Sequence, residues 1–478
     1  MTTEASNEFA PLPSSPNTAN QSTYFVFFIA SVAAIGGFLF GFDSGVINGT
    51  VSALSNTFNA TDVSTGFNVA SVLLGCAIGA LLAGPLADKV GRKPVMTVTA
   101  IIFAISAWGS GISTTATEFI LYRLLGGLGI GAASVLAPAY IAEIAPAAIR
   151  GRLATLQQLA IVLGLFTAFL SNFLIASVAG GAEGLLFFNI AAWRWMFWVE
   201  LIPAVLFVIG VIFIPESPRY LVAQGKLQQA QAIFAKISSD KVEQQVAAVQ
   251  RSLNSEKKPS IADLFMAGQK KIHPIIWVGI GLSVFQQFVG INVVFYYGAE
   301  LWRAAGFDES QSLLINVITG TTNILSTFIA IALVDKIGRK PLLITGSIGM
   351  FISLAALTFI FGSADIDQAG QLSLTSAMGT IALVMANLFV VFFGLSWGPI
   401  VWVLLGEMFN NRIRGVALAV AASAQWLANF AITMTFPILL GSVGLAGAYG
   451  LYALSAFISI FFVVKYIKET RGKALEAM

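Results

Sequence analysis

Twelve stretches of mostly apolar residues follow one another along the chain of 478 residues, with polar segments between them. Each has about the 20 residues that a helix needs to cross the hydrocarbon core of a bilayer. The pattern therefore predicts an all-α integral membrane protein with twelve transmembrane helices. The stretches lie near residues 24–48, 66–86, 95–113, 118–142, 153–178, 192–214, 274–298, 310–334, 341–362, 377–406, 413–437 and 446–467.

The longest polar segment divides these stretches into two groups of six. Within it, residues 220–255 are rich in Gln and Ala and carry apolar residues at helical spacing, which predicts short amphipathic helices. The predicted organisation is a disordered cytoplasmic tail (1–23), an N-terminal six-helix bundle (24–214), a cytoplasmic linker (215–273), a C-terminal six-helix bundle (274–467) and a short cytoplasmic tail (468–478).

The composition supports a membrane protein and narrows its chemistry. Hydrophobic residues make up 57% of the chain and charged residues only 10%, whereas soluble domains contain about 25% charged residues. A net charge of +3 gives no reason to expect a nucleic acid partner. With one cysteine and one histidine, we expect no intrachain disulfide, no metal site and no cofactor.

The basic residues are distributed unevenly over the predicted loops. When loops are assigned alternately to two sides, all Lys and Arg except Arg123, Arg194 and Arg303 fall on one side. Because loops rich in Lys and Arg stay in the cytoplasm, both termini are predicted to be cytoplasmic.

The two halves also share motifs in the same order. The segment Asp88–Pro94 (DKVGRKP) returns as Asp335–Pro341 (DKIGRKP), and Glu143 with Arg150 returns as Glu407 with Arg414. Two parallel six-helix repeats place a substrate site between the halves near the middle of the bilayer, where rocking opens it to either side. The repeat thus favours a transporter.

Five motifs stand out along the chain: Asp88–Pro94, Pro215–Arg219, Gln286–Asn292, Asp335–Pro341 and Ser396–Pro399. Together they resemble the sugar porter family of the major facilitator superfamily, over about residues 25 to 475. Within that family the chain is most similar to bacterial glucose permeases, cyanobacterial ones in particular, and next to the bacterial xylose–proton symporter. The resemblance implies a secondary transporter of the bacterial plasma membrane, not an enzyme, that imports glucose or a related hexose with a proton by alternating access.

The candidate proton-coupling pair is Asp43 with Arg123. Asp43 lies deep in the first apolar stretch and Arg123 in the fourth, and an ionisable residue inside a membrane segment is by default functional. Burial favours the neutral acid while the arginine favours the carboxylate, so protonation can respond to conformation. The resemblance agrees, since the proton-coupled sugar porters carry Asp at this position. The alternative is a structural ion pair without proton transport.

A sugar site needs neutral amides and an aromatic surface. On a straight helix the side chains of Gln286 and Asn292 would point roughly 240° apart; the resemblance implies that this helix breaks near Gly290. It also assigns Trp397 and Trp426 to sugar stacking and the cavity wall. The candidate sugar-binding residues are Gln158, Gln286, Gln287, Asn292, Asn323, Trp397, Gln425, Trp426 and Asn429. Taken singly, each amide can instead be an interhelical hydrogen bond.

An apolar wall for this site is expected from five further residues. Two of them, Leu165 and Phe295, stand where the xylose symporter carries Gln and Leu, which favours a hexose over xylose. The predicted wall consists of Phe28, Ile161, Leu165, Phe295 and Tyr296.

Charged residues at the cytoplasmic helix ends form a candidate gate. Ion pairs between neighbouring helix ends can hold that side shut and break when it opens; the alternative is static anchoring by basic residues. The family resemblance favours the gate. The residues are Arg92, Glu143, Arg150, Glu200, Glu216, Arg339, Glu407, Arg414 and Glu469.

Other functions stay open at this stage. The nearest are an uncoupled sugar uniporter with the same site and a xylose–proton symporter. A membrane sugar sensor is a rival from another class, although sensors usually carry a longer cytoplasmic tail. The expected partners are a small monosaccharide, a proton and the lipid bilayer, with the protein as a monomer.

Overall fold

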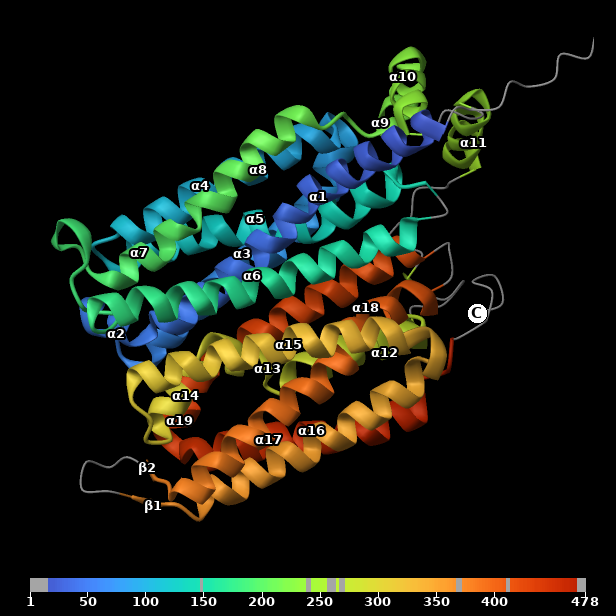
Figure 1. Ribbon diagram of the computed structural model, residues 1–478. Coiled ribbons are helices and arrows are strands. Elements are labelled where there is room, and N and C mark those ends of the chain that lie inside the picture. Colours follow the sequence, from blue (N-terminus) through green and yellow to red (C-terminus); the bar gives the residue numbers. More distant parts are fainter. Residues whose placement is uncertain are drawn as a thin grey trace, which may run out of the picture.

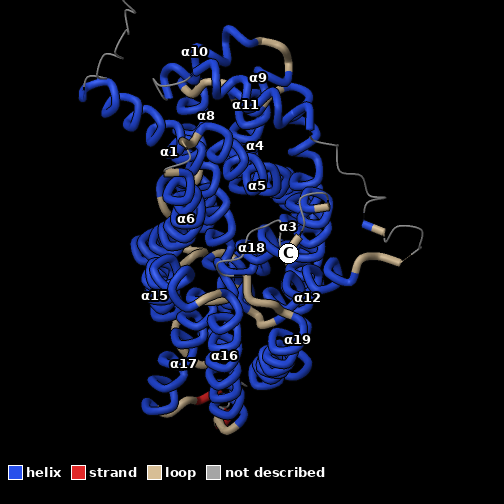
Figure 2. The backbone as a smooth tube through the Cα atoms, turned by 90° about the vertical axis from the view of Figure 1, so that its right-hand side faces the viewer, coloured by secondary structure: helices blue, strands red, loops and turns tan. Residues whose placement is uncertain are grey.

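The computed structural model describes residues 16–146, 149–237, 242–255, 264–265, 271–366, 372–409 and 413–470, and it is almost entirely helical (Figures 1 and 2). Among these residues, 11 helices are long and apolar enough to cross a membrane. The longest of them changes direction at Gly444, which has a φ of 67°, and so contains two of the predicted stretches. Each of the twelve predicted spans therefore has a counterpart.

The N-terminal half begins with a helix that starts earlier than the apolar stretch predicted. Pro16 opens it, at the position in the first turn where proline is favoured, so residues 16–23 are helical and residues 1–15 lie outside the described part. The elements are α1 (Pro16–Val46), η1 (Ile47–Gly49), α2 (Val51–Phe58), α3 (Asp62–Val90), α4 (Arg92–Ile112), α5 (Ala116–Ile144), α6 (Arg150–Ala179), η2 (Phe187–Asn189), α7 (Ala192–Val199) and α8 (Leu201–Phe213).

Three short linker helices lead to the C-terminal half. They are amphipathic, as predicted, and pack their own apolar core of Leu221, Val222, Ala230, Phe234 and Val246. The linker helices are α9 (Pro218–Ala223), α10 (Leu227–Ile237) and α11 (Val242–Ser255).

The C-terminal half follows the linker. Its elements are α12 (Pro274–Phe288), α13 (Ile291–Tyr296), α14 (Gly298–Ala304), α15 (Glu309–Ile337), α16 (Arg339–Gly362), β1 (Asp365–Ile366), β2 (Leu372–Ser373), α17 (Ser376–Leu395), α18 (Trp397–Met408) and α19 (Arg414–Tyr466).

The two halves form separate bundles that lie side by side, blue to green and yellow to red in Figure 1. Contacts between them run along α3 with α19 and along α6 with α15. Helices α9 to α11 and the end of α19 lie at one end of the molecule. We call it the basic end, because Arg92 and Arg339 bond there to Glu216 and Glu469. The hairpin of β1 and β2 lies at the opposite end.

Glycines allow the helices of the N-terminal half to pack backbone to backbone. A Cβ at Gly127 or Gly131 would collide with a carbonyl oxygen of α3, and one at Gly41 or Gly164 would collide across the α1–α6 contact. Small residues at helix contacts are typical of membrane bundles, where close packing and not water exclusion holds helices together. This packing brings α1, α3, α5 and α6 close enough for their few polar side chains to meet.

Candidate functional site

The Asp43–Arg123 pair is formed inside the N-terminal bundle. The guanidinium of Arg123 donates to Asp43 Oδ1 at 2.5 Å and to the Asp43 carbonyl at 3.4 Å. Both residues are only 1% exposed, and the Arg123 guanidinium also lies 5.7 Å from the centre of the Phe197 ring. A buried pair of opposite charges avoids the large cost of a single buried charge.

Glu200 lies beside this pair and not at the basic end, so its assignment to the cytoplasmic gate is wrong. It sits between α7 and α8 inside a membrane span, 1% exposed, and its carboxyl interacts with Asp43 and Arg123. No described N–H or O–H group donates to either carboxyl oxygen, and a hydrogen bond with the Asp43 carboxyl needs a proton on one of the two acids. Its place near the middle of an apolar stretch was the signal in the sequence, because ionisable residues there are functional by default.

The seventh span is interrupted at the predicted point. Gly290 has a left-handed φ of 85° and separates α12 from α13. A Cβ on Gly290 would lie 2.6 Å from the Tyr452 ring, so glycine is needed for its conformation and for its lack of a side chain. The break removes the straight-helix geometry that would point the amides of Gln286 and Asn292 apart.

The three amides of this span consequently form one hydrogen-bonded chain. Asn292 Nδ2 donates to Gln287 Oε1, and Gln287 Nε2 donates to Gln286 Oε1 at 3.2 Å. Gln286 Nε2 in turn donates to the carbonyl oxygens of Trp397 at 2.8 Å and Gly398 at 3.2 Å. The chain thus links the broken seventh span to the second break in this half, between α17 and α18.

The predicted aromatic and α19 residues lie around the same region. Asn429 Nδ2 donates to the Tyr296 hydroxyl at 3.4 Å. Trp426 packs against Phe40 of the other half, with ring centres 5.8 Å apart. Trp397 is fully buried, and its indole N–H donates to Ser347 Oγ at 2.9 Å. This bond fixes the residue whose carbonyl oxygen accepts from Gln286.

A small cavity of about 10 Å³, enough for about one water molecule, lies where the two halves meet near these groups. Arg123 and Ser44 line it from the N-terminal half, and Tyr296 and Trp426 from the C-terminal half. Arg123 of the candidate proton pair, and Tyr296 and Trp426 of the candidate sugar site, therefore face a shared space.

The remaining predicted sugar residues are more scattered. Leu165 is buried and Gln158 and Ile161 half-buried along α6, while Phe295 lies 6.4 Å from the Phe169 ring of that helix. Phe28, in contrast, is 46% exposed. Asn323 is buried, and Gln425 Oε1 has no hydrogen-bond partner among the described residues.

Several buried amides escaped the sequence analysis, Gln157 and Asn48 among them. Gln157, next to the predicted Gln158, packs against α1 at Gly37 and has no described partner for either amide atom. Asn48, just after α1, makes three hydrogen bonds to the other half. Both lie in apolar stretches of the sequence, and that position was the available signal.

The candidate gate residues of the N-terminal half form a compact cluster at the basic end. Arg92 donates to Glu143 at 3.0 Å and pairs with Asp88 at 2.9 Å. Glu216 accepts the backbone N–H of Arg92 at 2.9 Å, at the start of α4, where helix N–H groups lack internal partners. Ser217 Oγ donates to the other oxygen of Glu143.

The C-terminal half repeats this cluster. Arg339 donates two hydrogen bonds to Glu407, at 2.9 and 3.2 Å, and Glu469 accepts the backbone N–H of Arg339 at 3.1 Å. Thr470 Oγ1 takes the place of Ser217 and donates to Glu407 at 2.6 Å. The motif repeat of the sequence is therefore a repeat of three-dimensional contacts.

Two predicted gate residues behave differently. Arg414 donates to the carbonyl oxygen of Phe409, at 3.0 and 3.2 Å. The side chain of Arg150 lies outside the described residues. The ion pairs of Arg92 and Arg339 each join helices of one half, so they fix the helix ends within a bundle.

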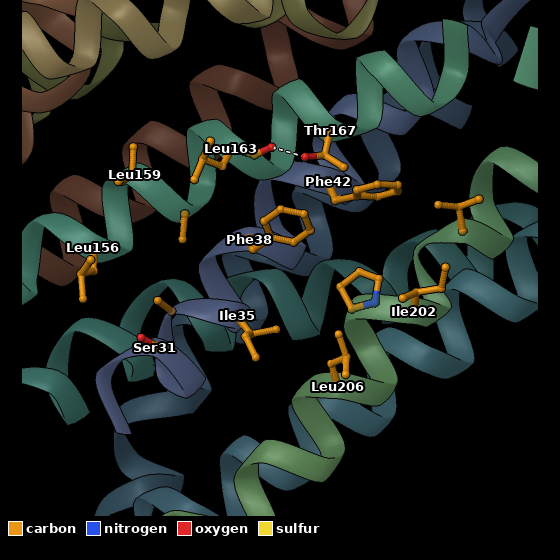
Figure 3. Close-up of a pocket in the computed structure, with 14 residues that line it drawn as sticks. Ser31, Ile35, Phe38, Phe42, Leu156, Leu159, Leu163, Thr167, Ile202 and Leu206 are labelled. Carbon is orange, nitrogen blue, oxygen red and sulfur yellow. Dashed lines mark hydrogen bonds between the residues drawn. The ribbon is translucent and has the colours of Figure 1, made fainter. Parts of the chain in front are cut away.

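A larger cavity, of about 520 Å³, lies between α1, α6 and α8 (Figure 3). It is lined by apolar side chains such as Phe38, Leu159 and Leu206, and by none of the predicted sugar-binding residues. Its Thr167 hydroxyl is already bonded to the Leu163 carbonyl. Such a lining suits a hydrocarbon chain of the bilayer and cannot satisfy the hydroxyls of a sugar.

Comparison with known proteins agrees with this geometry. The family model described as "Sugar (and other) transporter" matches residues 29–478. The glucose transport protein of Synechocystis sp. is 56% identical over 97% of this chain and 99% of its own length. The D-xylose–proton symporter of Escherichia coli is 39% identical over 97% and 96%. A partially occluded inward-open structure of the E. coli xylose transporter XylE matches with a TM-score of 0.81 and 36% identity over 94% of this chain and 100% of that chain.

Proposed function

We propose that this chain, which belongs to the sugar transporter family, imports glucose or a closely related hexose together with a proton by alternating access. The fold is the twelve-helix major facilitator fold, and the protein is a transporter and not an enzyme. The relative with 56% identity is a glucose transport protein, which favours glucose as the substrate.

The chain of amides in the broken seventh span is the observation that carries the sugar site. Gln286, Gln287 and Asn292 present donors and acceptors without net charge, which matches the hydroxyls of a neutral sugar. Because the amides bond to one another, a sugar that enters replaces these bonds with its own and leaves no amide unpaired. Tyr296, which is bonded to Asn429, and Trp426 add aromatic surface from α13 and α19.

The charge balance around Asp43 supports proton coupling. The single positive charge of Arg123 faces two carboxyl groups, those of Asp43 and Glu200. The group of three can hold one proton without leaving an unbalanced buried charge. A uniporter has no need of a second buried acid, so Glu200 argues for symport over the uncoupled alternative.

The transport cycle follows from these parts. A proton enters from outside and neutralises a carboxyl group beside Arg123, sugar binds to the amides, and the two halves rock to open the cytoplasmic side. Sugar and proton then leave. With the basic end in the cytoplasm, as the distribution of Lys and Arg predicts, both termini face the cytoplasm of a bacterial cell. We propose that the monomer is the transporting unit, since each part of the site lies within one chain.

Xylose is the second candidate substrate, because the symporter with 39% identity carries it. Two wall residues favour a hexose. Leu165 is buried and Phe295 lies against Phe169, so the wall is apolar where the xylose symporter has a glutamine.

Counterflow of labelled sugars in liposomes tests the substrate directly, because it needs a binding site and alternating access but no proton gradient. We expect labelled glucose to enter against a load of unlabelled glucose and xylose to exchange more weakly. Gln286→Ala should reduce glucose counterflow at least about tenfold, through loss of amide bonds worth about 1 kcal/mol each. Gln244→Ala, on the exposed face of linker helix α11, is the control. Full glucose counterflow by Gln286→Ala, or xylose exchange faster than glucose exchange, would overturn the proposal.

A further inference from the structure

Hydrogen bonds join the two halves at the end opposite the basic end, where α2 and α14 meet (Figure 1). Asn48 bonds to Phe295, Ala299 and Asn316, and Ser52 bonds to Glu300 and Arg303. A third contact joins Glu309 to the backbone N–H of Ala182 at 2.7 Å. Under the orientation proposed above this is the outer end, so the structure is closed to the outside.

Asn48 makes the most extensive of these contacts. Its Nδ2 donates to the Phe295 carbonyl at 2.9 Å, and its Oδ1 accepts the Ala299 N–H at 3.0 Å and Asn316 Nδ2 at 2.8 Å. The side chain is 1% exposed, so water cannot replace these partners while the contact stands.

Two of the three partners of Asn48, the Phe295 carbonyl and the Ala299 N–H, are groups that a second break in the seventh span leaves without helical bonds. Tyr297, with φ −116° and ψ 16°, separates α13 from α14. Phe295 O lies at the end of α13 and Ala299 N in the first turn of α14, where carbonyl and N–H groups lack partners within the helix. An amide side chain offers one donor group and one acceptor and therefore satisfies both sides of the break at once.

We propose that Asn48 is the positioning residue that latches the outer part of the seventh span (α13 and α14) to the first span and holds the outer side closed. Opening to the outside requires its three hydrogen bonds to break together. Gly298 keeps the contact tight, because a Cβ there would collide with the amides of Asn316 and Asn48.

The latch joins the two candidate sites through the backbone. Asn48 follows Asp43 in the same span, and Phe295 and Tyr296 belong to the predicted sugar wall. A change at the Asp43–Arg123 pair that shifts the end of the first span is therefore transmitted to the helix that covers the sugar. This inference rests on the proposed alternating access, but it does not depend on which sugar is carried.

Spin-label distances test the latch without any substrate. In a Cys76→Ser background, labels at Thr57→Cys and Ser310→Cys report the outer end, and labels at Lys226→Cys and Lys336→Cys report the basic end; all four positions are exposed. With Asn48 intact we expect a short outer distance to dominate. Asn48→Ala should raise the population with a long outer distance about tenfold relative to the short one, equivalent to about 1.4 kcal/mol, with a matching decrease in the long distance at the basic end.

Asn172→Ala is the matched control. Asn172 is also 1% exposed and donates to a carbonyl oxygen, that of Val46, at 3.0 Å, but this bond lies within the N-terminal half. It should leave both distance distributions unchanged. Asn48→Asp, which keeps the acceptor for Ala299 but turns an oxygen toward the Phe295 carbonyl, should open the outer side as Asn48→Ala does.

Asn316→Ala provides a milder variant that leaves both main-chain bonds of Asn48 in place, and a smaller shift in the same direction is expected. An unchanged outer distance in Asn48→Ala and Asn48→Asp would overturn the proposal, as would an equal shift in Asn172→Ala. If the Asn48 variants show the expected distance shifts but the intact protein shows no glucose counterflow, the result counts against the proposed substrate and not against the latch.

Discussion

Two carboxyl groups share one guanidinium in the N-terminal half, and this arrangement at single residues is the basis of the proton-coupling proposal. Asp43 holds the hydrogen bonds to Arg123, whereas Glu200 has no described N–H or O–H donor and faces the Asp43 carboxyl. A buried carboxyl without a hydrogen-bond donor is costly as a charge, so Glu200 is the group best placed to take up a proton and pass it to Asp43.

The variant Glu200→Gln tests this role, since it keeps the shape of the side chain and removes its acidity. The Asp43–Arg123 pair remains, so sugar exchange should persist. Proton-driven accumulation should fall from about tenfold per pH unit to below about threefold, because coupling then depends on Asp43 alone. The measurement is the steady-state ratio of internal to external glucose in liposomes. Glu243→Gln on the exposed face of α11 is the control, and accumulation by Glu200→Gln at the level of that control would exclude this role.

At this scale the sequence predicted the Asp43–Arg123 pair correctly but not its neighbour. A charged residue in an apolar stretch marks a functional position, and this applies to Asp43, Arg123 and Glu200 alike. Grouping Glu200 with the acidic residues of the helix ends was the error. Glu200 is the one acidic residue of its apolar stretch, and hydropathy places it well inside the membrane. Which acid pairs with Arg123 depends on helix packing that hydropathy does not reveal.

At the scale of elements, the breaks within spans matter more than the spans themselves. The breaks at Gly290 and Tyr297 in the seventh span, and at Ser396 in the tenth, free backbone groups for side chains to bind. The amide chain ends on carbonyls beside the Ser396 break, and the Asn48 latch closes on the Tyr297 break. Both candidate functions of the seventh span thus rest on interrupted helix.

Gly290→Ala tests the importance of the first break. Alanine in a left-handed conformation costs about 1–2 kcal/mol, and its Cβ would also meet the Tyr452 ring at 2.6 Å. We expect the amides to lose their alignment and glucose affinity to fall at least about tenfold. Competition by unlabelled glucose in counterflow measures this. Gly225→Ala separates the two causes, since Gly225 has a similar φ of 73° but no atom within 4 Å of the added Cβ; equal behaviour of the two variants would contradict the account.

The existence, order and approximate limits of the spans were predictable from hydropathy, because length and apolar content alone decide whether a helix crosses a bilayer. The alignment of Gln286, Gln287 and Asn292 was not predictable from helical geometry, which points them apart. It required knowledge that the helix breaks near Gly290, which the family resemblance supplied; the positive φ of Gly290 is a finding of the structure. The three hydrogen bonds of Asn48 could not be predicted from the sequence, since they depend on how the two halves meet.

At the scale of the whole molecule, the twofold repeat appears as two equivalent charge clusters at the basic end. Arg92, Glu143 and Glu216 in one half correspond to Arg339, Glu407 and Glu469 in the other. Each cluster ties the ends of several helices within its own half and so keeps each bundle rigid while the halves rock against each other.

Arg92→Ala and Arg339→Ala should therefore destabilise the protein by similar amounts. Each removes charged hydrogen bonds from a partly buried cluster, at a cost of about 1–3 kcal/mol, and the double variant should be additive because the clusters share no described partner. Thermal unfolding in detergent, followed by tryptophan fluorescence, gives the Tm shifts. Arg251→Ala, whose guanidinium bonds only to its own helix in the described contacts, is the control. A large effect in one half alone would contradict the equivalence of the clusters.

The most direct test of the central claim is the accumulation of labelled glucose in liposomes with an inward gradient of one pH unit. One proton carried per sugar sustains a glucose gradient of about tenfold, because one pH unit is worth about 1.4 kcal/mol. The account predicts accumulation toward this value for the intact protein and an internal-to-external ratio of about 1 for Asp43→Asn, with counterflow retained in the variant. A ratio of about 1 for the intact protein, or accumulation by Asp43→Asn, would contradict proton-coupled import through this pair.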